Sequence, residues 1–220
     1  MKFSKIAAGI AALAISTASM ADVVLSEGFD SVGGLAGAGW VQVNSSTNAS
    51  NPFFQGNPGI FPSAAGAADS YVGADFLSGF GTISNWLITP VLEFGSRLHV
   101  EFMVRVAGAG FLDGLEVRMS TNGASTNVGS GAFAAGDFST LLGFYYSDTD
   151  NGWQAQHYGF EGLTPGTQGR LAFRYFVADT NTGGNYLGID SLTVTVPEPT
   201  TLALAGLALA GLALSRRRQA

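Results

Sequence analysis

The sequence predicts an all-β fold, a single antiparallel β-sandwich or jelly roll that lies between two separate terminal segments. Glycine supplies 31 of the 220 residues, twice its usual share of about 7 %, and it falls between short apolar runs. Several of these runs alternate apolar and polar residues with a period of two, which is the pattern of a half-buried strand. The middle of the chain nowhere sustains the 3.6-residue period of a helix.

The alternation is clearest in residues 97–106, where Leu98 and Val100 share one face and His99 and Glu101 share the other. Turn sequences rich in Gly, Pro and Asn separate this run from similar ones on either side. By the same criteria we expect strands at residues 23–29, 39–43, 70–76, 85–88, 90–94, 97–106, 115–120, 141–146, 153–158, 170–178 and 186–196.

The N-terminal segment has the pattern of a secretory signal peptide. Lys2 and Lys5 give a positive start, Ile6–Ile15 is apolar, and the small residues Ser19 and Ala21 precede a cleavage site after Ala21. The alternative is a membrane anchor, but the apolar run is short of the about 20 residues that span a bilayer. We therefore assign residues 1–21 to a signal peptide that is removed by signal peptidase.

The C-terminal segment, residues 197–220, has three parts in a fixed order. Val196-Pro197-Glu198-Pro199 is followed by the apolar run 200–214 and then by Arg216, Arg217 and Arg218. Proline cannot donate to a strand ladder, so the sandwich is expected to end here. The apolar run favours a helix, and snorkelling arginines on the cytoplasmic side would extend it into a membrane span.

This order resembles the PEP-CTERM sorting signal of exported bacterial proteins. The resemblance implies that a membrane protease called exosortase recognises and processes the tail. By the same resemblance, Val196, Pro197, Glu198 and Pro199 form the recognition and cleavage region. The apolar run is then a transient anchor in the inner membrane.

The remaining part, residues 22–196, is one acidic domain. It holds five arginines, no lysine and 15 acidic residues, a net charge of −10. Such a surface repels phosphate backbones, which excludes nucleic acid as a partner. The chain has no cysteine, which excludes thiol catalysis, disulfide scaffolds and cysteine-based zinc sites.

A second resemblance covers nearly all of this domain. Its short motifs look like those of the choice-of-anchor J domain of secreted bacterial proteins. That family is similar to MAM and galactose-binding-like jelly rolls, and it implies an extracellular sandwich without an agreed catalytic activity. The motifs that carry the resemblance are residues 25–30, 39–40, 85–90, 115–121, 171–175 and 188–194.

Two carboxylates suggest a metal site. Glu27 shares a strand face with Leu25, and Asp190 shares one with Leu192, so both are expected on inward positions of the first and last strands. A buried carboxylate is costly unless it is paired or bound to metal, so Glu27 and Asp190 are candidate ligands of a structural calcium ion. The alternatives are hydrogen bonds to backbone amides or a pair with Arg174.

The candidates for catalysis are few, and those for binding are more numerous. His99 and His157 lie on different strands, and the common nucleophile, zinc and phosphate motifs are missing from the sequence. We therefore expect no enzyme. Aromatic residues beside polar turns are candidates for sugar binding, whereas Trp86 is expected in the core. These candidates are Trp40, Trp153, Tyr145, Tyr146, Tyr158 and Tyr186.

Together these features predict a non-enzymatic bacterial surface or matrix protein of structural or adhesive type. It would cross the inner membrane, be processed by an exosortase-like system and end at the cell surface or outside. The alternative is a module that binds extracellular polysaccharide on the same fold. A glycan-active hydrolase is the third hypothesis, which would need two carboxylates flanking a cleft.

Overall fold

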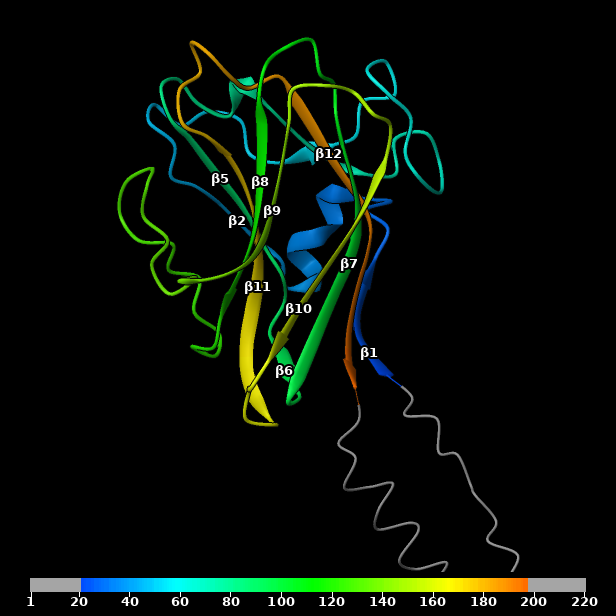
Figure 1. Cartoon of the computed structure of the whole chain (residues 1–220), viewed down its shortest axis with the longest axis vertical. Helices are drawn as coiled ribbons and strands as arrows, with labels where there is room; N and C mark the ends of the chain where they lie inside the picture. Colours follow the sequence, from blue (N-terminus) through cyan, green and yellow to red (C-terminus); the bar gives the residue numbers. More distant parts are fainter. Residues whose placement is uncertain (1–20, 198–220) are drawn as a thin grey trace, which may run out of the picture. The chain divides into compact units, whose positions relative to one another are not determined.

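The structure is a computed structural model that describes residues 21–197, and it confirms the antiparallel β-sandwich. Twelve strands within these residues form two six-stranded sheets that face each other (Figure 1). The signal peptide up to Met20 and the predicted apolar helix of residues 200–214 lie outside the described residues. Within the part that is described, no helix has the length and apolar character needed to cross a membrane.

The first sheet, called the β12 sheet, is built around the last strand of the domain. Strand β12 pairs with β7 on one flank and with β4 and β1 on the other. Its strands, in spatial order, are β10 (Gln154–Glu161), β7 (Arg97–Val106), β12 (Tyr186–Pro197), β4 (Val72–Asp75) and β3 (Phe54–Gln55), with β1 (Ala21–Glu27) also paired to β12.

The second sheet, called the β11 sheet, is built around an equally long central strand. Strand β11 pairs with β5 and β6 on one flank and with β8 on the other. Its strands, in spatial order, are β2 (Val41–Asn44), β5 (Ile83–Ile88), β11 (Thr167–Val177), β8 (Asp113–Ser120) and β9 (Thr140–Ser147), with β6 (Leu92–Phe94) also paired to β11.

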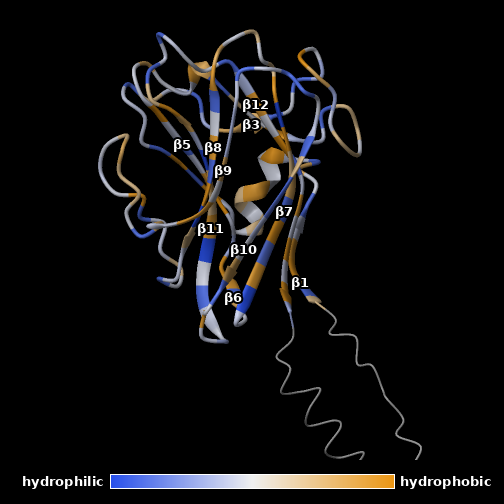
Figure 2. Ribbon diagram, in the orientation of Figure 1, coloured by the Kyte–Doolittle hydropathy of each residue, from blue (hydrophilic) through white to orange (hydrophobic). Residues whose placement is uncertain are grey.

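The core lies between the two inner faces. In β7 every second residue is buried, as the alternation of its hydropathy predicts (Figure 2). Phe102 of β7 meets Phe173 of β11 edge to face, with ring centroids 5.3 Å apart. Burial of such apolar side chains is the main source of stability in a domain that has no cysteine.

A 3-10 helix that the sequence did not predict, η1 (Val32–Ala38), lies between the two sheets (Figure 1). It buries Val32 and Leu35 in the core. Trp40 follows it and packs against Phe29 with ring centroids 5.7 Å apart. Trp40 is buried, so the expectation that it lies on a sugar-binding surface is wrong.

Each sheet also has an outer face that is covered by a loop. Residues 56–71 cover the β12 sheet, where Phe61, Tyr71 and Tyr186 form a buried cluster. Residues 121–139 cover part of the β11 sheet, where Val128 and Phe138 pack on Trp86. Trp86 is therefore buried as predicted, but beneath this loop and not between the sheets.

The sandwich has two ends that differ in role. At the terminal end β1 begins and β12 ends, with Ala21 opposite Pro197 and Asp22 opposite Val196 (Figure 1). At the other end, called the apical end, residues 178–185 connect β11 to β12. The first and last strands of the domain are therefore paired, and the chain enters its sorting region at the terminal end.

Candidate functional site

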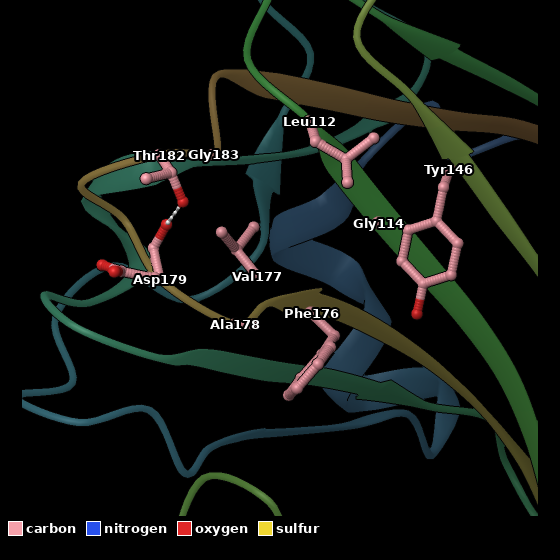
Figure 3. A pocket seen from close by; sticks show the side chains of 9 residues that line it. All are labelled: Leu112, Gly114, Tyr146, Phe176, Val177, Ala178, Asp179, Thr182 and Gly183. Atoms are coloured by element: carbon pink, nitrogen blue, oxygen red, sulfur yellow. Dashed lines mark hydrogen bonds between the residues drawn. The ribbon is translucent and has the colours of Figure 1, made fainter.

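A pocket opens at the apical end of the β11 sheet. Its volume is about 320 Å³, which lies at the lower end of the range that takes small ligands. Strands β8, β9 and β11 and the β11–β12 connection supply its walls, which are mostly apolar. The residues that line this apical pocket are Leu112, Gly114, Tyr146, Phe176, Val177, Ala178, Asp179, Thr182 and Gly183 (Figure 3).

The floor of the pocket depends on a residue without a side chain. A Cβ atom at Gly114 would collide with the Tyr146 ring and with the Phe176 carbonyl oxygen. Because position 114 is glycine, the Tyr146 ring lies across β8 toward β11. Glycine at position 114 is therefore one requirement for this arrangement of the pocket.

The rim of the pocket is held by backbone hydrogen bonds. The Gly184 amide donates to the Leu112 carbonyl at 2.9 Å, and the Thr180 amide donates to the Gly81 carbonyl at 2.8 Å. The Thr182 hydroxyl donates to the main-chain oxygen of Asp179 at 3.3 Å (Figure 3). These bonds join the loops that contain Gly81, Leu112 and residues 179–184 at the apical end. The rim is therefore preformed.

Polar groups lie at the rim and offer both donors and acceptors. One Asp179 carboxylate oxygen accepts from the main-chain and side-chain nitrogens of Asn181, at 2.9 and 2.8 Å. Burial raises the pKa of the Tyr146 phenol, and the Glu116 charge raises it further. Tyr146 therefore keeps its proton at physiological pH and remains a hydrogen-bond donor.

Exposed aromatic rings continue the pocket along the sheet. Phe144 and Tyr146 lie side by side on β9 with centroids 5.3 Å apart, and Phe133 meets Phe176 at 5.8 Å. The exposed fractions of Phe133, Phe144 and Tyr146 are 73, 58 and 42 %. Clusters of exposed apolar side chains are typical of interaction sites, whereas single ones need no explanation.

A buried ion network lies beside the pocket on the same face. Arg174 of β11 donates to a Glu116 carboxylate oxygen at 2.9 Å, and Arg118 donates to the same oxygen at 2.6 Å. Arg174 also donates to the Ser84 hydroxyl at 2.9 Å and to the Ala132 carbonyl. The bond to Ala132 ties the covering loop to the sheet.

Charge decides the protonation of this network. Burial would raise the pKa of Glu116, but the hydrogen bond from Arg118 and the Arg174 and Arg118 charges together lower it. Glu116 therefore stays ionised at neutral pH. Arg174 lies between aromatic rings, with its guanidinium carbon 4.2 Å from the Phe176 centroid and 4.9 Å from that of Trp86. Such cation–π contacts stabilise a desolvated arginine.

A buried carboxyl group lies at the apical start of β8. One oxygen of Asp113 accepts from the Tyr175 hydroxyl at 2.6 Å and from the Asn185 amide at 2.8 Å. Its other oxygen has no hydrogen-bond partner among the described residues. Burial raises the pKa of Asp113 despite these bonds.

Two of the predicted sugar-binding aromatics belong to the covered face of the β12 sheet. Tyr186 is buried, and its hydroxyl lies 3.0 Å from that of Tyr71. The Trp153 indole donates to the Pro62 carbonyl at 2.9 Å, and its ring meets Phe61 edge to face at 5.5 Å. These rings build a structural cluster, so the expected surface role of Tyr186 is wrong.

Two further residues that were candidates for sugar binding lie at the edge where β9 and β10 meet. Tyr145 is half-buried and packs on the core. Tyr158 lies over Gly143, and its hydroxyl donates to the Phe144 carbonyl at 2.9 Å. Of the six predicted aromatic residues, Tyr146 is the one that lines the apical pocket.

A backbone irregularity in β12 changes which way one member of the predicted metal pair faces. Ser191 has a φ of 53°, and the β12 register shifts between Asp190 and Thr193. Asp190 therefore does not share the inner face with Leu192, which corrects the expectation from alternation. Instead, one Asp190 oxygen accepts from the Ala64 and Ala65 amides, at 2.8 and 3.0 Å.

Glu27 has a separate partner. Its carboxylate accepts from the Phe29 amide at 2.8 Å, so it stabilises the turn that follows β1. Residues 21–197 contain no group of three or more His, Cys, Asp or Glu side chains placed to hold a metal ion. A calcium ion bound by Glu27 and Asp190 stays a prediction.

The two histidines lie on neighbouring strands of the β12 sheet. Both are exposed, and His157 Nδ1 lies 3.4 Å from a Glu101 carboxylate oxygen. His99 pairs with Gly159 in the same ladder. Neither histidine lines the apical pocket.

The end of β12 is also the start of a recognised signal. Residues 195–218 match the PEP-CTERM protein-sorting motif. Its first residues, Thr195, Val196 and Pro197, still belong to β12, and the Val196 side chain lies against Gly95. Glu198, Pro199, Arg216, Arg217 and Arg218 lie outside the described residues. The sorting signal thus begins inside the folded domain.

Solved structures with a similar fold include adhesin domains. The K1 cleaved adhesin domain of Lys-gingipain from Porphyromonas gingivalis W83 has a TM-score of 0.58 and 20 % identity, over 79 % of this chain and 98 % of that one. For the K3 domain the values are 0.58 and 18 %, over 80 and 99 %, and for the K2 domain 0.56 and 18 %, over 78 and 97 %. These similarities show the fold alone. A search of curated proteins gave no match.

Sequence reasoning missed most of the pocket. Phe176 and Asp179 were not among the candidates, although the alternation of residues 170–178 already placed Phe176 on the face opposite to Tyr175. Gly114 within a strand was a second signal, because an isolated glycine there often marks a close approach of another group. The loop contacts at the rim had no sequence signal.

Proposed function

We propose that this protein is an exported bacterial surface or matrix protein of structural or adhesive type, without catalytic activity. The observation that carries the proposal is the sorting motif at residues 195–218, which continues directly from the last strand of the sandwich. Signal peptidase would cut after Ala21, and an exosortase-like membrane protease would process the tail around Val196–Pro199. The apolar run would hold the chain in the inner membrane only until that cut.

The folded domain supports the adhesive part of the proposal. Its fold is shared with the adhesin domains of Lys-gingipain, and its motifs resemble the choice-of-anchor J domain. The apical pocket lies at the end of the sandwich away from Pro197. A chain that is attached at the C-terminal end of its sandwich would therefore leave the pocket accessible.

The second candidate function is a carbohydrate-binding module. The apical pocket favours it, because aromatic side chains, Tyr146 and Phe176, and polar ones, Asp179 and Thr182, line the same hollow. Aromatic side chains with a few convergent polar groups are typical of small-ligand sites. A polysaccharide of the extracellular matrix would then be the partner.

A localisation experiment tests the proposed function. The full chain is expressed in a bacterium that encodes an exosortase, beside a variant in which Arg216, Arg217 and Arg218 are replaced by alanine. We expect the wild-type chain outside the inner membrane with its tail removed, and the variant in the inner membrane with its tail intact. Fractionation and mass spectrometry of the C-terminus measure both.

Two controls sharpen this test. Tyr146→Ala alters the pocket and leaves the tail unchanged, so its localisation should match the wild type. Deletion of the exosortase gene should reproduce the location of the arginine variant. The proposal is wrong if wild type and arginine variant fractionate alike and carry the same C-terminus.

A further inference from the structure

The charged groups of the domain restrict which ligand can bind. Residues 22–196 contain no lysine, and their 15 acidic residues outnumber five arginines. Each arginine already has partners in the described structure. These pairs are Arg97 with Glu161, Arg105 with Asp150, Arg118 and Arg174 with Glu116, and Arg170 with the carbonyl oxygens of Gly39 and Thr89.

An anionic polymer would therefore meet an unfavourable surface. Binding of carboxylate or sulfate groups usually relies on arginine or lysine side chains that form charge-assisted hydrogen bonds. The exposed Arg97 begins β7 at the terminal end of the sandwich and is paired with Glu161. Arg105 would have to leave Asp150, to which it donates at 2.9 and 2.8 Å. Arg174 is buried and Arg118 is half-buried, and both donate to carbonyl oxygens of the loop of residues 121–139.

The apical pocket offers mostly apolar contacts and no cationic side chain. The Tyr146 and Phe176 rings and the Leu112 and Val177 side chains provide apolar contact, and Asp179 lies at the rim with its carboxylate directed outward, on the side away from Tyr146 (Figure 3). A pyranose ring combines an apolar C–H face with hydroxyl groups at its edge. It can place the first on an aromatic ring and donate from the second to a carboxylate or a carbonyl.

We propose that the apical pocket binds a sugar residue of a neutral glycan, and that the domain rejects anionic polysaccharides. This inference rests on the proposed surface function and names the ligand class of its pocket. The aromatic residues Phe144 and Phe133 extend the contact beyond the pocket along the β11 sheet. A chain of several sugar units would lie across these rings.

Calorimetry on the full chain tests the proposal. The chain is purified in a detergent without a sugar headgroup, so that the detergent does not compete for the pocket. The neutral probes are hexasaccharides of β-1,4-glucose, α-1,6-glucose and β-1,4-mannose, and the anionic probes are hexasaccharides of β-1,4-mannuronate and α-1,4-galacturonate. We expect submillimolar binding of at least one neutral probe and none of the anionic probes.

Three variants locate the binding. Tyr146→Ala should weaken it by about tenfold or more, the scale of one lost aromatic contact. Asp179→Asn should weaken it less, since an amide keeps one acceptor oxygen. Leu141→Ala is the matched control, because Leu141 is an equally exposed apolar residue at the other end of β9, and it should leave the affinity unchanged.

Three outcomes would overturn the proposal. They are the absence of neutral-sugar binding at millimolar concentration, equal or tighter binding of an anionic probe that Tyr146→Ala weakens, and neutral binding that Tyr146→Ala leaves intact. Failure of this test leaves the localisation result unaffected, because sorting depends on the tail. The proposed surface function and the ligand of the pocket are thus judged separately.

Discussion

The two outer faces of the sandwich hold similar residues and use them differently. On the β12 sheet the loop of residues 56–71 covers Phe61, Tyr71 and Tyr186, and the two tyrosine hydroxyl groups bond to each other and to the backbone. On the β11 sheet the loop of residues 121–139 covers Trp86 but leaves Phe144 and Tyr146 exposed. One face is closed, and the other is open at its apical end.

The difference shows that the presence of aromatic residues does not by itself identify a binding surface. On the closed face each tyrosine hydroxyl is hydrogen-bonded and each ring packs on another, so these residues stabilise the fold. On the open face the rings contact each other, but their outer surfaces remain in water. The covering loop decides between these roles, and its path depends on contacts that are distant in the sequence.

The largest expected difference concerns apolar packing. Phe61→Ala on the closed face removes a ring that stacks on Tyr71 at 5.3 Å and meets Tyr186 at 5.3 Å. It should lower the free energy of unfolding by about 3–5 kcal/mol. Phe144→Ala on the open face should change it by less than about 0.5 kcal/mol. Urea denaturation measures the change in the free energy of unfolding for each variant. Equal changes would contradict the assignment of one face as closed and the other as open.

The next effect concerns the anchor of the loop on the open face. Arg174→Met removes the buried partner of Glu116 and the bonds to Ser84 and Ala132. It should cost about 3 kcal/mol of stability, at the low end for a broken buried pair because Glu116 keeps Arg118. If the loss stays near zero, the network does not hold the loop.

A smaller effect separates the two kinds of tyrosine. The Tyr71 hydroxyl accepts from the Asn57 amide at 2.9 Å and lies 3.0 Å from the Phe61 carbonyl. Tyr71→Phe should lower stability by about 1–2 kcal/mol, because buried backbone groups lose a partner. Tyr146→Phe should leave the midpoint of urea unfolding unchanged. If Tyr146→Phe lowered stability more than Tyr71→Phe, the assignment of the closed and open faces would be wrong.

The smallest effect is a pH dependence at the apical edge. Burial raises the pKa of Asp113 above its ordinary value of 3.8, so the folded chain holds this proton more tightly than the unfolded chain. The resulting stability is fully present below the ordinary pKa and is lost as pH rises through the raised one.

Asp113→Asn should therefore flatten the fall in melting temperature between acidic and neutral pH. The measurement compares thermal unfolding of both proteins over that range. Parallel curves for wild type and variant would contradict the raised pKa of Asp113.

Much of the fold was predictable, because strand alternation is a local signal. The predicted strand at residues 97–106 matches β7 at both ends. The helix η1 and the short strand β3 were missed, since neither has a periodic pattern that a local rule can detect.

The site was less predictable, because it depends on irregular backbone and on loops. Alternation placed Asp190 on the inner face, but the register shift at Ser191 turns it toward Ala64 and Ala65. Residues 123–136 are rich in small side chains, and no periodic pattern there indicates what the loop contacts. In the structure Arg174 and Arg118 donate to the carbonyls of Ala132 and Phe138.

Hydroxyl-radical footprinting of the exported protein tests the central claim most directly. The claim is that one aromatic face of the sandwich is closed and the other is open to ligands. We predict rapid oxidation of Phe133, Phe144 and Tyr146 and protection of Phe61, Tyr71 and Tyr186 under the same exposure. Similar oxidation of both groups, or protection of Tyr146, would contradict the account.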